Sequence, residues 1–319
     1  MCPRQRILLC VAMFLLMTLS LATESVANPS VSSKTWEVNV ELRNQIYLPT
    51  PRPVQDVFIM LNNTTPNLVY RIERNQADDL TNLAREAYAT TNATPHDPYK
   101  VTPKPLGPFP KGADLGFTLG QWLAAIGTGT YAEENDNSTM NFTFRNLVPN
   151  GVYTVHYTRI TMPPNFNEML IPVGAPDGSQ NAFKADAKGN ATFNLKLKTL
   201  PASTNITFKD FAAMYVTKTA PITANITWTL ISVVYHSDGK TKGASLGEPG
   251  KNAHGQMVHL MYPKPYRTYE EWKNAALVAA TTKTETVADK SREKQPGFEG
   301  SFAITGLLAM AYLALGRRW

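Results

Sequence analysis

The chain has 319 residues, a formal net charge of +6 and 18% charged residues. The basic residues are scattered along the sequence rather than clustered with aromatic residues, so the composition does not predict nucleic acid binding. The two cysteines, Cys2 and Cys10, lie in a segment predicted below to be removed. A mature chain without them excludes disulfides, thiolate metal sites and cysteine nucleophiles.

Residues 1–27 have the features of a secretory signal peptide. Arg4 and Arg6 precede an apolar core at residues 7–21, and Ser25-Val26-Ala27 offers the small-x-small pattern that signal peptidase accepts. The predicted mature chain therefore begins at Asn28 and is exported.

Residues 28–110 are predicted to hold short strands, one helix and a proline-rich loop. Residues 36–42 alternate apolar and polar side chains with period two, which is typical of a half-buried strand. Residues 54–61 and 68–72 are further short candidates. Apolar positions from Leu80 to Tyr88 follow helical spacing. The proline-rich residues 102–111 could link two domains, although we favour a loop across the outside of one domain.

Residues 111–265 are predicted to form the core of a β-sandwich. A short helix is expected at residues 119–126, followed by strands joined by turns such as Pro149-Asn150-Gly151. Residues 225–236 are apolar on both faces, as expected of a central strand, and residues 256–262 form the last strand. The spacing predicts a mainly β fold, a Greek-key β-sandwich with a few short helices.

A helix is expected at residues 266–281, because Thr268 and Glu271 have the spacing of a capping box. Residues 282–295 are polar and charged, and we interpret them as a stalk between the body and the C-terminal segment.

Familiar catalytic motifs are absent from the sequence. It contains no G-x-S-x-G, H-E-x-x-H, P-loop, G-x-G-x-x-G or EF-hand pattern. The adjacent carboxylates Asp78/Asp79 and Glu133/Glu134 point apart on a helix or strand, so neither pair predicts an acid–base couple.

A group of histidines and methionines late in the chain is the one candidate metal site. Imidazole and thioether ligands together favour copper, and zinc is the alternative. A blue-copper site is excluded because it needs a cysteine. The competing interpretation is structural, with the Met/His stripe packed beneath the C-terminal helix. The candidate ligands are His236, His254, Met257 and His259, with Met261 on the same strand face.

Eight N-x-[ST] sequons predict glycosylation of an exported protein. They lie at Asn62, Asn63, Asn92, Asn137, Asn141, Asn190, Asn205 and Asn225.

The C-terminal segment, residues 296–319, combines three features in order. Pro296-Gly297-Phe298 precedes an uncharged apolar run at residues 302–316, and Arg317 and Arg318 follow it. Fifteen residues make about 22 Å of helix, less than the roughly 30 Å hydrocarbon core. The arrangement resembles the PGF-CTERM sorting signal of archaeal surface proteins. The resemblance implies removal of the tail by an archaeosortase-like enzyme and replacement by a lipid; an ordinary C-terminal anchor helix is the alternative.

Phrases in the middle of the chain are similar to an uncharacterised secreted family of methanogenic archaea and some bacteria. They are residues 117–123, 146–154 and 235–241. That resemblance implies one module and carries no activity.

These features predict an extracellular, lipid-anchored and glycosylated protein, held at the membrane or surface layer. Its leading function is non-enzymatic, either binding a partner or building the cell envelope or surface layer (S-layer), with no cofactor. The first alternative is a copper- or zinc-binding envelope protein. The second is a carbohydrate-active extracellular enzyme, supported by fold analogy alone.

Overall fold

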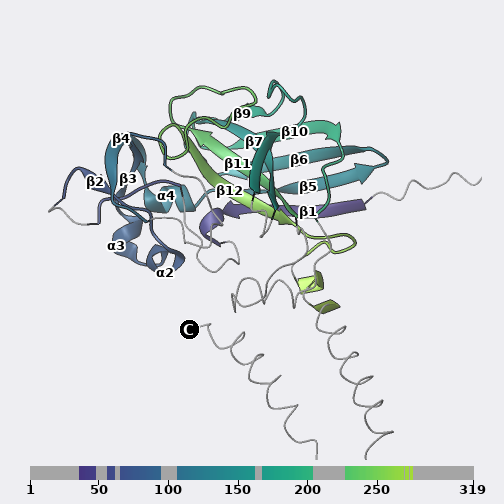
Figure 1. Ribbon diagram of the computed structural model, residues 1–319, viewed down its shortest axis with the longest axis horizontal. Coiled ribbons are helices and arrows are strands. Elements are labelled where there is room, and N and C mark those ends of the chain that lie inside the picture. Colours follow the sequence, from purple (N-terminus) through teal and green to yellow (C-terminus); the bar gives the residue numbers. More distant parts are fainter. Residues whose placement is uncertain are drawn as a thin grey trace, which may run out of the picture.

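A computed structural model describes residues 36–47, 56–61, 65–94, 106–161, 167–203, 227–268, 270–272 and 274–275 (Figure 1). The predicted signal peptide, stalk and sorting tail lie outside these residues. Among the helices that are described, none is long and apolar enough to cross a membrane.

A large antiparallel sheet of nine strands forms the body of the protein. Its order is β10-β6-β5-β1-β12-β11-β7-β8, and β9 also pairs with β7. The prediction of a mainly β fold with a few short helices is confirmed. The strands are β1 (Trp36–Asn44), β5 (Ile126–Glu134), β6 (Asn137–Arg145), β7 (Val152–Thr161), β8 (Asn167–Pro172), β9 (Ala182–Lys184), β10 (Ala191–Lys198), β11 (Thr227–His236) and β12 (Ala253–Met261).

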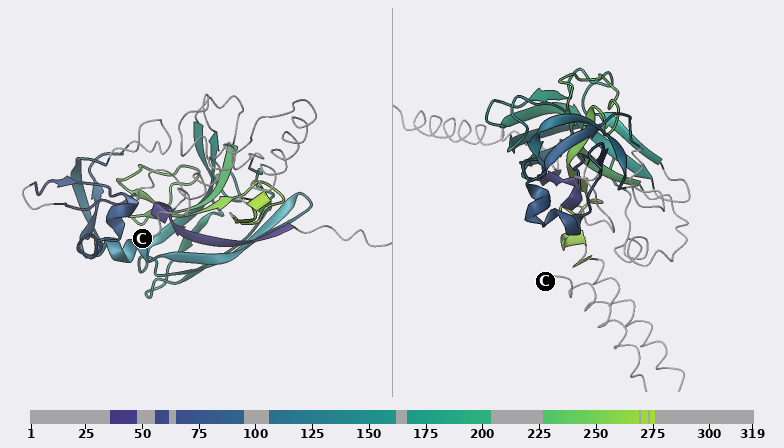
Figure 2. Two further views of the ribbon diagram at one scale, coloured as in Figure 1. Left: turned by 90° about the horizontal axis from the view of Figure 1, so that it is seen from below. Right: turned by 90° about the vertical axis from the view of Figure 1, so that its left-hand side faces the viewer.

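The large sheet curls, so that its two ends approach each other around one core (Figure 2). Phe183 of β9 stacks on Phe144 of β6 with ring centroids 4.8 Å apart. The same ring lies 5.8 Å from Phe193 of β10. The two packed layers expected of a sandwich are therefore two parts of a single curled sheet.

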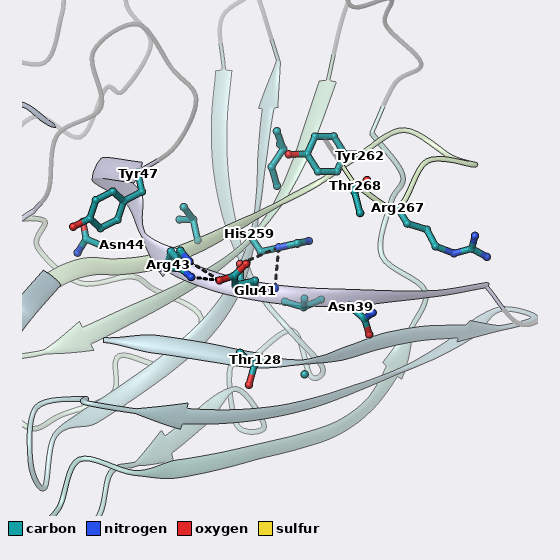
Figure 3. Close-up of a pocket in the computed structure, with 14 residues that line it drawn as sticks. Asn39, Glu41, Arg43, Asn44, Tyr47, Thr128, His259, Tyr262, Arg267 and Thr268 are labelled. Atoms are coloured by element: carbon teal, nitrogen blue, oxygen red, sulfur yellow. Dashed lines mark hydrogen bonds and ion pairs between the residues drawn. The ribbon is translucent and has the colours of Figure 1, made fainter. Parts of the chain in front are cut away.

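Alternation along β1 sets which face of the sheet is inward. Val38, Val40 and Leu42 are buried, whereas Asn39 and Glu41 between them are exposed. β1 pairs with β5 along most of its length. Its pairing with β12 covers only Arg43↔Val258 and Asn44↔Met257. Beyond these two pairs the strands separate, as Figure 3 shows.

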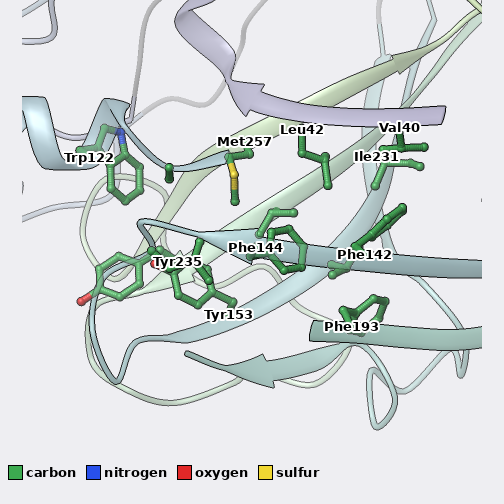
Figure 4. Packing of buried hydrophobic residues seen from close by; sticks show 14 of the residues in the cluster. Val40, Leu42, Trp122, Phe142, Phe144, Tyr153, Phe193, Ile231, Tyr235 and Met257 are labelled. Carbon is green, nitrogen blue, oxygen red and sulfur yellow. The ribbon is translucent and has the colours of Figure 1, made fainter. Parts of the chain in front are cut away.

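The core is built from the inward side chains of seven strands of the large sheet, including Tyr131 of β5. β1, β5, β6, β7, β10, β11 and β12 all contribute to one cluster of buried apolar residues (Figure 4). β11 is buried along both of its faces, as predicted for a central strand. Every residue of β11 after Thr227 is buried, so this strand also needs a cover on its outward face.

A second sheet of three strands, in the order β2-β4-β3, comes from the earlier part of the chain. β4 crosses residue 110, and β1 belongs to the large sheet, so residues 28–110 contribute strands to both sheets. The bounds are β2 (Leu68–Val69), β3 (Glu86–Thr90) and β4 (Phe109–Thr118).

The helices of the described chain are short: η1 (Gln45–Tyr47), α2 (Arg74–Ala77), α3 (Leu80–Leu83) and α4 (Leu119–Leu123). The predicted helix over residues 80–88 was wrong in its second half, because Glu86–Thr90 form β3 and pair with β4. The short helix expected at residues 119–126 is confirmed over Leu119–Leu123 as α4, which begins with a capping box formed by Thr118 and Gln121. Ile126 instead begins β5. Residues 270–272 and 274–275 are helical, as expected.

Shortening a side chain in β11 tests whether this strand is the centre of the core. Ile231 is fully buried in the core cluster, so Ile231→Ala should lower the free energy of unfolding by about 2–5 kcal/mol. Chemical denaturation monitored by tryptophan fluorescence measures the loss. Thr192→Ala, at an exposed position of β10, should change stability by less than about 0.5 kcal/mol; equal losses for both variants would contradict the assigned core.

Candidate functional site

The candidate histidine ligands do not meet at one point in the structure. His259 lies opposite Ile231 of β11, five residues along that strand from His236. At about 3.3 Å per residue, the two histidine positions are about 17 Å apart. They also lie on opposite faces, because Ile231 points into the core and His236 points outward.

His236 belongs instead to a buried polar pair on the outward face of the sheet. Nε2 of His236 lies 2.8 Å from Oγ1 of Thr154, and Nε2 of His156 lies 3.0 Å from the same oxygen. One hydroxyl can donate to one ring and accept from the other, so the two imidazoles have different tautomers. Burial lowers the pKa of both His156 and His236 to about 4, and both rings are neutral at pH 7.

His254 and Met257 have structural positions. Nδ1 of His254 donates to the main-chain oxygen of Asp56 at 2.9 Å, and its Nε2 accepts from Oγ of Ser237 at 3.2 Å. Met257 is fully buried in the core cluster. Within the described ranges, no three His, Cys, Asp or Glu side chains are arranged to hold a metal ion.

His259 has a different environment, between two strands that separate. Its Nδ1 lies 3.1 Å from the main-chain oxygen of Glu41 and 3.3 Å from the Glu41 nitrogen. The imidazole thus interacts with the part of β1 where β12 would otherwise continue the ladder. Burial lowers the pKa of His259, and the ring is neutral at pH 7.

The separation of β1 from β12 leaves a groove of about 620 Å³, which we call the β1–β12 groove (Figure 3). This volume is in the range of small-molecule binding sites. The groove is lined by Asn39, Val40, Glu41, Arg43, Asn44, Tyr47, Thr128, Gly129, Val258, His259, Leu260, Tyr262, Arg267 and Thr268.

The polar groups of the groove are partly paired with one another. The carboxylate of Glu41 forms an exposed ion pair with Arg43, and Nε of Arg43 donates to it at 2.5 Å. Arg267 donates from Nε to the main-chain oxygen of Glu37 at 2.9 Å. The lining therefore combines ionic, amide, hydroxyl and aromatic groups with the aliphatic side chains of Val258 and Leu260.

Two side-chain nitrogens of the lining, Nδ2 of Asn44 and Nε2 of His259, are exceptions to this pairing. Both are buried and have no hydrogen-bond partner among the described residues. A buried polar atom without a partner costs about 1–3 kcal/mol. Such an atom in the lining of a groove indicates a position where a ligand can supply the missing hydrogen bond.

Sequence reasoning selected His259 but missed the groove around it. Period two in β1 already places Glu37, Asn39 and Glu41 on one outward face. The sequence holds no comparable signal that the ladder between β1 and β12 stops after two pairs.

Four sequon asparagines lie within the described residues, and all four are exposed. They are Asn92, Asn137, Asn141 and Asn190. The remaining sequons, at Asn62, Asn63, Asn205 and Asn225, lie outside those residues.

Comparison with known proteins identifies the C-terminal segment. Residues 295–315 match the PGF-CTERM motif. No curated protein and no solved structure matches the chain, so the similarity of the middle region to a secreted family gains no support. The motif match indicates an extracellular, membrane- or surface-anchored archaeal protein that is processed by an archaeosortase.

The buried histidine pair predicts a loss of stability in acid. Both pKa values are about 4 in the folded protein, against about 6.5 in an unfolded chain. Between these pH values the unfolded chain binds more protons, so stability falls as the pH drops from 7 to 4, by up to about 3 kcal/mol per histidine. Urea unfolding at several pH values measures the slope.

In the variant with both His156→Gln and His236→Gln, the free energy of unfolding should fall less steeply as the pH drops. Some pH dependence should remain, because burial also lowers the pKa values of His254 and His259. An unchanged unfolding midpoint between pH 7 and pH 4.5 in the unsubstituted protein would contradict the neutral, buried state of these rings.

Proposed function

We propose that this is a surface-anchored binding protein that holds a ligand of the cell exterior in the β1–β12 groove. The observation that carries the proposal is Nε2 of His259, a buried ring nitrogen without a described partner in the lining of that groove. The C-terminal motif supports a location at the cell surface, where the groove would be open to ligands outside the cell.

The chemistry of the groove favours binding over catalysis. Glu41 is the one carboxylate among the described lining residues, and it is already paired with Arg43. Glycoside hydrolysis generally uses two carboxyl groups flanking the scissile bond. A carbohydrate-active enzyme therefore has less support at this site than a binding protein.

Copper or zinc binding also has less support than binding in the groove. His236 and His259 lie on opposite faces of the sheet, and Nε2 of His254 is engaged by Ser237. A shared site would require these strands to rearrange.

Glycosylation and a lipid anchor complete the proposal. The exposed positions of Asn92, Asn137, Asn141 and Asn190 leave these side chains accessible to a glycosyltransferase. A lipid in place of the apolar tail would hold the folded body at the membrane among envelope and surface-layer components.

Removal of the C-terminal tail is tested by the mass of the mature protein. Native protein extracted with detergent should lack the signal peptide and the residues beyond about Phe298. Replacing Pro296, Gly297 and Phe298 with alanine should leave the tail attached, as intact mass spectrometry would show. Lys294→Ala, just before the matched residues, is the control; a peptide ending at Trp319 in the mature unsubstituted protein would contradict processing.

Filling the groove tests the binding site. Thr128 lines the groove from an exposed position of β5, so Thr128→Trp should block it without disturbing the core. Tagged full-length protein should retain a defined envelope component after washing, and Thr128→Trp should lose it. Affinity capture from the organism's own envelope, followed by glycan and protein mass spectrometry, measures retention.

Thr192→Trp provides the matched control for this experiment. Thr192 is exposed on β10, and it does not line the groove. Equal retention by the Thr128→Trp and Thr192→Trp variants would place the binding surface elsewhere.

A further inference from the structure

The β1–β12 groove has an excess of positive charge at one end. Glu41 and Arg43 compensate each other within the groove. Arg267 is exposed, and its Nε donates to a main-chain oxygen. The carboxylate of Glu271 accepts from the main-chain nitrogen of Arg267 at 2.7 Å, but Glu271 does not line the groove, and the guanidinium forms no ion pair within the described ranges. Figure 3 shows Arg267 and Tyr47 toward opposite ends of the groove. An occupant therefore meets a guanidinium group at one end.

The groove is elongated, following β1. The lining residues on β1 run from Asn39 to Asn44, and these five residue steps span about 17 Å at about 3.3 Å per residue. A chain of several units fits this length better than a single compact molecule does. The walls offer it side-chain amides and hydroxyls from Asn39, Asn44 and Thr128.

The main chain of β1 is already engaged by side chains in this region. Nδ1 of His259 bonds with Glu41, and Nε of Arg267 bonds with Glu37. An extended peptide that added a strand here would have to displace both side chains. A ligand that bonds with side chains rather than with the strand edge is therefore favoured.

Resting on the proposed function, we infer that the groove binds an oligosaccharide that carries carboxylate groups. Hydroxyl groups both donate and accept, so a sugar can pair with Nε2 of His259 in either tautomer. A sugar carboxylate would receive a charge-assisted, two-point hydrogen bond from Arg267. Tyr47, 38% exposed, has Arg74 over its ring at 5.8 Å, and the opposite face of the ring can pack against a sugar.

Calorimetry with matched sugars tests the inference. Full-length protein in detergent would be titrated with tetramers of galacturonic, glucuronic and mannuronic acid and with their methyl esters, which keep the sugar and remove the charge. At least one acid should bind about tenfold or more tightly than its ester, as expected for a charge-assisted hydrogen bond. Arg267→Gln should bring the acid down to the affinity of the ester.

Arg145→Gln is the control, because it removes the same charge from an exposed position of β6 that does not line the groove. It should bind as the unsubstituted protein does. Equal binding of acids and esters, abolished by Thr128→Trp, would overturn the acidic ligand and leave the proposed groove in place. Binding of an acidic peptide, together with no binding of any of the sugars, would overturn the inference that the ligand is a saccharide. Failure of all six sugars would overturn the inference, while the envelope capture experiment decides the proposed function separately.

Discussion

The burial of β11 on both faces is the constraint on which the rest of the structure depends. Its inward residues, such as Ile231 and Val233, pack into the core enclosed by the curled sheet. Its outward face carries Ser232 and His236, which cannot be covered without hydrogen-bond partners. Neighbouring β7 supplies them: Thr158 bonds with Ser232 at 2.8 Å, and Thr154 bonds with His236. The central strand thus fixes its neighbour through polar pairs outside and apolar packing inside.

The groove follows from a polar residue at an inward position. His259 lies between Met257 and Met261 on β12, and both methionines are in the core. An imidazole there needs a hydrogen-bond partner, and the main chain of Glu41 provides it. This contact takes the place of strand pairing, so β1 and β12 separate. The same residue that would weaken a closed sheet therefore accounts for the groove.

Local patterns predicted the strands better than they predicted the site. Alternation identified β1, and apolar character on both faces identified β11, because each reports burial directly. Helical spacing at Ala87 and Tyr88 was misleading, because pairing of β3 with β4 overrode it. The predicted histidine metal site did not form for a similar reason. Closeness in sequence did not reveal that His236 and His259 point to opposite faces of the sheet. Nor did it reveal that the pairing of β11 with β12 shifts register between Val233 and Val234.

The described residues contain no cysteine, so contacts other than disulfides hold the two sheets together, and Asp56 and Arg71 provide one. The buried guanidinium of Arg71 lies 5.0 Å from the ring of Phe58 and 3.8 Å from Asp56. Asp56 also binds the start of β12, accepting from His254 at its main-chain oxygen and from the Gly255 nitrogen at its carboxylate. Removing one partner from such a buried pair costs about 3–5 kcal/mol. Because β12 is held here and again at Val258 by β1, it can diverge only beyond Val258, where the groove opens.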